Sequence, residues 1–181
     1  MGCDAPEAHD ASPWVVRFAS LIPPTGPVLD IASGAGRHTR WFLARGRDVV
    51  AVDRDVSGLD DVHEHDRLEV VEADLESGGP FPLGDRRFAG VVVTNYLYRP
   101  LLHRLVSVVA APGALLYETF AVGNERFGRP TRPEFLLRPG ELLDVVRGRL
   151  RVVAFEDLVV DEPRPAALQR IAAVRDAENA R

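Results

Sequence analysis

The stretch Val28-Leu29-Asp30-Ile31-Ala32-Ser33-Gly34-Ala35-Gly36-Arg37-His38-Thr39 decides the fold of this chain. It places small residues between an apolar segment, typical of a buried strand, and an amphipathic helical pattern. Gly34 and Gly36 can adopt positive φ and bring backbone N–H groups close to a ligand. A strand-turn-helix unit of this kind lies at the carboxyl edge of a sheet, where open α/β folds bind cofactors. We therefore expect a cofactor site at this bend.

Valine-rich segments alternate with helical patterns on either side of this stretch, which indicates βαβ units on a largely parallel, buried sheet. The sequence predicts one Rossmann-like, doubly wound α/β domain over residues 12–175, with flexible tails over residues 1–11 and 176–181. Its mostly parallel seven-stranded sheet has an antiparallel edge hairpin and helices on both faces. The predicted strands cover residues 27–32, 48–53, 68–73, 88–95, 114–119, 150–160 and 167–174. The predicted helices cover residues 12–21, 37–45, 56–63, 99–110 and 140–147.

Composition excludes several classes of protein. A chain of 181 residues, 46% of them hydrophobic, fits one domain with a real core. The net charge of -5 indicates no partnership with nucleic acid, and no apolar run is long enough for a membrane span. All basic residues are arginines, which excludes phosphate-loop and Schiff-base lysines, and the single cysteine excludes an intramolecular disulfide. We expect a cytoplasmic protein without a metal site.

Carboxylates follow three successive predicted strands. Asp30 would repel a pyrophosphate but attract the ammonium group of an amino acid, and S-adenosylmethionine carries such a group. Asp53, nineteen residues after Gly34, can accept hydrogen bonds from both ribose hydroxyls. Asp74 can accept a hydrogen bond from an adenine amino group. Together the three carboxylates favour S-adenosylmethionine as the cofactor.

On these residues the chain resembles the class I S-adenosylmethionine-dependent methyltransferases over about Val28 to Glu118. Asp30, Gly34 and Gly36 match the glycine-rich motif of that family, and Ala32 replaces its first glycine. The resemblance implies that the chain is an enzyme that uses S-adenosylmethionine.

The same resemblance assigns roles to particular residues. It implies that Asp53 contacts the ribose, that Asp74 contacts the adenine, and that Thr94, Asn95 and Tyr96 end the fourth strand beside the cofactor. The full set of expected cofactor-binding residues is Asp30, Ala32, Ser33, Gly34, Ala35, Gly36, His38, Thr39, Asp53, Arg54, Asp74, Leu75, Asn95 and Tyr96.

A narrower likeness involves Gly36-Arg37-His38-Thr39, the helix that follows it, and Ala51-Val52-Asp53. These segments are similar to small bacterial enzymes such as the tellurite-resistance methyltransferases. The likeness does not identify the methyl acceptor, but the small size and acidic balance of the chain favour a small molecule.

Methyl transfer from a sulfonium needs orientation and, for some acceptors, a base, so no signature nucleophile is expected. Tyr96 and Glu118 are the candidate catalytic residues. Tyr96 could place its aromatic face against the sulfonium, and Glu118 could act as the base. The arginines of the long loop 121–139 favour an anionic acceptor and suggest a lid, although a solvated loop fits equally well. The candidate acceptor-binding residues are Tyr98, Arg99, Arg126 and Arg129.

Two other functions stay open on the sequence alone. Gly34, Gly36 and Asp53 would also serve an NAD-dependent oxidoreductase, although Thr39 replaces the third glycine of that motif and Asp30 opposes a pyrophosphate. A non-catalytic protein that keeps the nucleotide fold as a binding module is the second alternative, and the carboxylates do not exclude it.

Overall fold

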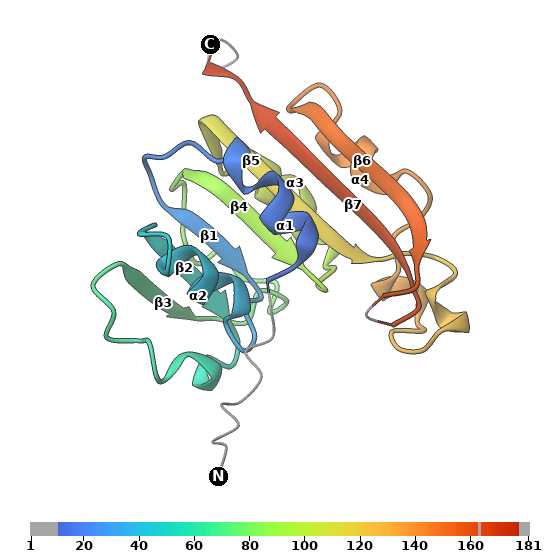
Figure 1. Ribbon diagram of the computed structural model, residues 1–181, viewed down its shortest axis with the longest axis horizontal. Coiled ribbons are helices and arrows are strands. Elements are labelled where there is room, and N and C mark those ends of the chain that lie inside the picture. The colour runs from blue at the N-terminus through green and yellow to red at the C-terminus, as the bar shows by residue number, and fades with distance from the viewer. Residues whose placement is uncertain (1–10, 163, 178–181) are drawn as a thin grey trace.

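A seven-stranded sheet in the order β3-β2-β1-β4-β5-β7-β6 forms the centre of the molecule (Figure 1). The structure, a computed structural model, describes residues 11–162 and 164–177. Strands β1 to β5 run parallel, whereas β7 is antiparallel to both β5 and β6. The strands are β1 (Val28–Ile31), β2 (Val49–Asp53), β3 (Leu68–Glu72), β4 (Phe88–Thr94), β5 (Val109–Phe120), β6 (Arg151–Val160) and β7 (Ala166–Arg175). The predicted seven-stranded sheet with an antiparallel edge hairpin is confirmed.

Helices cover both faces of this sheet, as predicted (Figure 1). Alternate residues of each strand supply two apolar cores: Val28 packs with α1 and α2 on one face, and Leu29 packs with α3 and α4 on the other. The α-helices are α1 (Pro13–Phe18), α2 (Arg37–Leu43), α3 (Leu102–Ser107) and α4 (Glu141–Val146). The 3-10 turns are η1 (Ala19–Leu21), η2 (Ser57–Leu59), η3 (Arg99–Leu101), η4 (Asn124–Arg126) and η5 (Pro133–Phe135).

Two predicted elements differ from the structure. The helix expected over 56–63 is only the single turn η2, because Leu59 is its one buried residue and the polar run after it has little apolar surface to bury. The helix expected over 99–110 ends at Ser107 and β5 begins at Val109, five residues earlier than expected. Pro112 lies in an irregular part of the β4–β5 ladder, where a residue without an N–H group is tolerated.

The expected tails fall largely on residues 1–10 and 178–181, which lie outside the described residues, so the domain boundaries stay predictions. Ala11, at the start of the described chain, is already buried. Within the described ranges, every helix is too short or too polar to cross a membrane.

Candidate functional site

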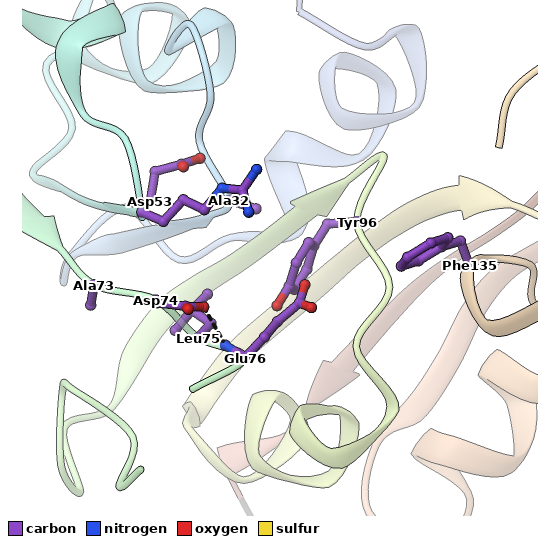
Figure 2. A pocket seen from close by; sticks show the side chains of 9 residues that line it. Ala32, Asp53, Ala73, Asp74, Leu75, Glu76, Tyr96 and Phe135 are labelled. Atoms are coloured by element: carbon purple, nitrogen blue, oxygen red, sulfur yellow. Dashed lines mark hydrogen bonds between the residues drawn. The ribbon is translucent and has the colours of Figure 1, made fainter. Parts of the chain in front are cut away.

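A cavity of about 410 Å³ lies at the carboxyl ends of β1 to β4, and we call it the strand-end cavity (Figure 2). Parallel strands bring the residues that follow them to one edge of the sheet, so residues distant in sequence meet here. The lining residues are Ala32, Asp53, Arg54, Ala73, Asp74, Leu75, Glu76, Tyr96 and Phe135. Six of the sequence-predicted cofactor residues are among them: Ala32, Asp53, Arg54, Asp74, Leu75 and Tyr96.

The bend after β1 forms one wall and fixes the Asp53 carboxylate. Ala32 and Gly34 both have a φ of 53°, so the chain turns sharply here. The Gly34 N–H donates to Asp53 Oδ2 at 2.7 Å, and the Asp55 N–H donates to Oδ1 at 3.1 Å. A Cβ at Gly58 would lie 2.8 Å from the Gly34 carbonyl oxygen, so η2 packs against the bend. Each Asp53 oxygen keeps a lone pair for a further donor.

Asp30 lies beneath this bend and does not line the cavity. Its side chain is buried, and the Thr39 hydroxyl donates to Oδ2 at 2.7 Å. Burial raises the pKa of Asp30 to about 6, against the opposing effect of the Thr39 hydrogen bonds and the Arg37 charge. The structure therefore brings Asp30 and Thr39 together, and their contact with a cofactor stays a prediction.

His38 is also buried, and it holds the segment before α1. The Ser12 N–H donates to His38 Nε2 at 3.1 Å, and Thr94 Oγ1 lies 3.4 Å from Nδ1. Burial lowers the pKa of His38 to about 3, and the nearby Arg37 charge adds to the shift. His38 is therefore neutral near pH 7 and accepts this hydrogen bond, and its predicted contact with the cofactor stays a prediction.

Two buried hydroxyls have no geometric hydrogen bond within the described structure: Ser33 Oγ, at the bend after β1 and outside the cavity lining, and Tyr96 Oη, in the lining. A buried polar atom without a partner costs free energy, which a bound ligand can recover. Tyr96 lies in the cavity with the Glu76 carboxylate beside it (Figure 2). Burial raises the pKa of Tyr96, and the charges of Glu76 and Asp74 raise it further. The Tyr96 hydroxyl therefore stays protonated and can donate.

Glu118, the predicted base, lies near the carboxyl end of β5 in a buried ion pair. Arg170 donates to Glu118 Oε2 at 3.1 Å, and the Ser12 hydroxyl donates to Oε1 at 2.7 Å. Glu118 and Asn95 line a second cavity, whereas Tyr96 lines the strand-end cavity. The two candidate catalytic residues therefore face different cavities, and their roles stay predictions.

Arg99, predicted to bind the acceptor, uses its guanidinium to hold the long loop. It donates to both carboxylate oxygens of Glu141, at 2.8 and 2.9 Å, and to the carbonyls of Glu134 and Leu136. Burial raises the pKa of Glu141, but the hydrogen bonds from Arg99 and Arg138 outweigh it and lower the pKa to about 2. These contacts fix the loop to the first turn of α4.

The other predicted acceptor residues lie apart from the strand-end cavity. Tyr98 lines a neighbouring cavity beneath the loop that joins β3 to β4. Arg126 donates to the Gly123 carbonyl, and its guanidinium lies 5.6 Å from the centre of the Phe127 ring. Arg126 and Arg129 are both exposed. Acceptor binding by these residues stays a prediction.

Sequence reasoning missed Ala73, Glu76 and Phe135 in the cavity lining. Ala73 and Glu76 flank the predicted Asp74, so the end of the third strand could have indicated them. Phe135 comes from η5 in the long loop, and no sequence pattern indicates which part of that loop returns to the sheet.

Comparison with known proteins finds methyltransferases that match part of the chain. Residues 28–111 match the model of a methyltransferase domain. The ribosomal RNA small subunit methyltransferase A of Thermosynechococcus vestitus is 35% identical over 106 residues, which are 55% of this chain and 38% of that protein. The chain therefore spans well under half of that relative.

Solved structures share the fold. TehB from Haemophilus influenzae superposes with a TM-score of 0.75 at 16% identity, covering 92% of this chain and 63% of TehB. The 1,6-didemethyltoxoflavin-N1-methyltransferase of Burkholderia thailandensis, solved with 1,6-didemethyltoxoflavin and S-adenosylhomocysteine, gives 0.67 at 18% identity, covering 91% and 77%. At these identities the likeness establishes the fold, and the predicted resemblance, including the likeness to TehB, is confirmed for the fold.

Proposed function

We propose that this chain, whose residues 28–111 match a methyltransferase domain and whose fold is shared with TehB, is a class I S-adenosylmethionine-dependent methyltransferase that methylates a small molecule. In this proposal the strand-end cavity binds S-adenosylmethionine. The observation that carries it is the pair of carboxylates, Asp53 and Asp74, that line one cavity from the ends of successive strands beside the Gly34 bend.

The residues present fit this cofactor. Asp53, held by two backbone N–H groups, is placed to accept from ribose hydroxyls, and Asp74 is placed to accept from the adenine amino group. Tyr96 Oη lies in the cavity lining and can donate to a polar ligand. Apart from its chain neighbours, no heavy atom of the described residues lies within 4 Å of a Cβ built at Gly34, so a ligand has room against the backbone there.

The bound cofactor would supply an electrophilic methyl group on a sulfonium, and the protein supplies orientation, charge and a route for the acceptor proton. Tyr117 donates from its hydroxyl to the Tyr96 carbonyl at 2.7 Å, which holds the segment after β4 in place. Glu118 remains our candidate base, since each of its oxygens keeps a lone pair beyond the Ser12 and Arg170 hydrogen bonds.

Two observations support a small, anionic acceptor. The toxoflavin-pathway relative was solved with a small heterocycle, and the arginines of this chain favour an anionic molecule. The ribosomal RNA relative makes RNA the competing acceptor, which the test below includes. A cytoplasmic location is part of the same proposal, because only one cysteine is present.

Isothermal titration with S-adenosylmethionine, S-adenosylhomocysteine and NADH tests cofactor binding. We expect the first two to bind and NADH not to bind. Asp53→Ala should weaken S-adenosylmethionine binding by about 10- to 100-fold, as expected for lost charged hydrogen bonds. Asp48→Asn is the matched control. Asp48 is exposed and directly precedes β2, at the end of the strand far from the cavity, so its replacement should leave the affinity for S-adenosylmethionine unchanged.

If the protein binds NADH but does not bind S-adenosylmethionine, the proposal is refuted. Release of S-adenosylhomocysteine from fractionated metabolite pools, with ribosomal RNA as a separate arm, then tests turnover. Cofactor binding without release in any arm would support the non-catalytic binding module instead.

A further inference from the structure

A second cavity, of about 620 Å³, lies at the same edge of the sheet, and we call it the Arg170 cavity. It is enclosed by the segment before α1, the ends of β4 and β5, and the connection between β6 and β7. Asn95 lines this cavity and the next residue, Tyr96, lines the strand-end cavity. The two cavities therefore flank consecutive residues after β4, a spacing suited to two ligands that react with each other.

The floor of the Arg170 cavity is a rigid polar network. Glu118 and Arg170 are direct partners in the β5–β7 ladder, and their side chains pair at 3.1 Å. Arg170 also pairs with Glu156 at 2.6 Å, and its guanidinium lies 5.0 Å from the centre of the Trp14 ring. Ser12 donates to Glu118 from the segment before α1. Two carboxylates share the one guanidinium of Arg170, and Arg17 lies 3.9 Å from Glu156, so these side chains are held in place before a ligand binds.

Two further arginines give the rim a surplus of positive charge. Arg37, at the start of α2, and Arg164, between β6 and β7, line the cavity with the single carboxylate of Glu162. Among the described residues, neither arginine lies within 4 Å of a carboxylate oxygen. The nearest polar contact of Arg37 is Thr94 Oγ1, at 3.5 Å. Such guanidinium groups favour a carboxylate or another planar anion.

One wall of the cavity is apolar. Phe120 and Leu168 are direct partners in the β5–β7 ladder, so their side chains share a face of the sheet. Val160 and Ala166, partners in the β6–β7 ladder, continue the same wall. A ligand here would meet cations at the rim and hydrocarbon along one side.

We propose that the Arg170 cavity is the acceptor site and that it takes a small organic carboxylate with an apolar body. The carboxylate binds Arg37 and Arg164, and the apolar part packs on Phe120 and Leu168. This assignment rests on the proposed function, because the cavity is an acceptor site only if the strand-end cavity holds the methyl donor. It replaces the exposed loop residues Arg126 and Arg129 as the source of selectivity for anions.

The test uses ligand-observed NMR with the full chain saturated with S-adenosylhomocysteine. The probes are benzoate, phenylacetate and hexanoate, each compared with its neutral amide. We expect the carboxylates to bind at least about tenfold more tightly than the amides, because a charged hydrogen bond is lost in the amide. Arg164→Ala should weaken carboxylate binding by a similar factor while S-adenosylhomocysteine affinity stays unchanged. Arg132→Ala, an exposed loop arginine, is the control and should bind the probes like the wild type.

Three results would overturn the assignment: no carboxylate binding, equal binding of the amides, or binding that is lost in the Arg126→Ala, Arg129→Ala double variant but kept in Arg164→Ala. Failure of S-adenosylhomocysteine to bind in the first step would instead refute the proposed function. The two failures are therefore distinguishable.

Discussion

Replacement of Arg99 by alanine should lower the free energy of unfolding and release the long loop 121–139 from α4. We expect no direct effect on acceptor binding. The Glu141 side chain is 7% exposed, and Arg99 supplies two of its hydrogen bonds. Truncating one partner of a buried ion pair costs about 3–5 kcal/mol. Because the Arg99 side chain is 31% exposed, we expect the lower end, about 3 kcal/mol.

The matched control is Arg138→Ala. Arg138 contacts the same Glu141 carboxylate at 3.2 Å, but its side chain is 72% exposed. Removing an exposed partner costs about 0–1 kcal/mol. The free energy of unfolding of both variants can be measured by urea titration, followed by the fluorescence of Trp14 and Trp41.

Hydrogen exchange supplies the second readout. Amides of residues 133–137 should exchange faster in Arg99→Ala, because Arg99 no longer binds the Glu134 and Leu136 carbonyls. Phe135 lines the strand-end cavity, so S-adenosylmethionine affinity should fall severalfold. A loss below about 1 kcal/mol, or equal to that of Arg138→Ala, would contradict this reasoning. An unchanged stability with a raised acceptor KM would instead support the sequence-based expectation that Arg99 binds the acceptor.

Two further predictions concern His38 and Gly36. In the unfolded chain His38 binds a proton once the pH falls below its usual pKa of 6.5, whereas in the folded chain its pKa is about 3. The free energy of unfolding therefore decreases as the pH falls from 6.5 toward 3. Relative to His38→Gln, the wild type should lose about 1.4 kcal/mol per pH unit between pH 6 and 4 in urea titrations, and a constant difference would refute this. Gly36→Ala should cost about 3 kcal/mol, because φ is 73° and the added Cβ would clash with Leu59 Cδ2. Gly46→Ala is the control: its φ is 70°, but the added Cβ meets open space, so it should cost only about 1 kcal/mol. Both costs can be measured by urea titration, and equal costs would show that the Leu59 contact does not matter.

Asp53 and Asp74 could be placed from the sequence because parallel strands end at one edge, so strand assignment alone brings such residues together. The Gly34 bend could be predicted for the same reason. Positions that depend on tertiary contacts could not. Arg99 is a plausible anion-binding residue in the sequence, and only the return of the long loop toward α4 gives it Glu141 as a partner.

The Arg170 cavity shows the same limit more strongly. Its network joins Ser12, Glu118 and Arg170, which are separated by 106 and 52 positions along the chain. Pairing at that range depends on the register of β7 against β5, which strand patterns do not specify. The helix predicted over 56–63 is only the single turn η2, because the segment has helical spacing without enough apolar surface to stabilise a longer helix.

The insertion of β7 between β5 and β6 has a consequence for the order of assembly during translation. The final described strand is an interior strand, so β6 emerges from the ribosome before the neighbour that pairs it with the rest of the sheet exists. The pairing of β7 with β5 joins segments far apart in the sequence, and non-local pairing slows folding. Until Arg170 is synthesised, Glu118 lacks the cationic partner that it has in the folded sheet, and the β5 edge of the sheet is still unpaired.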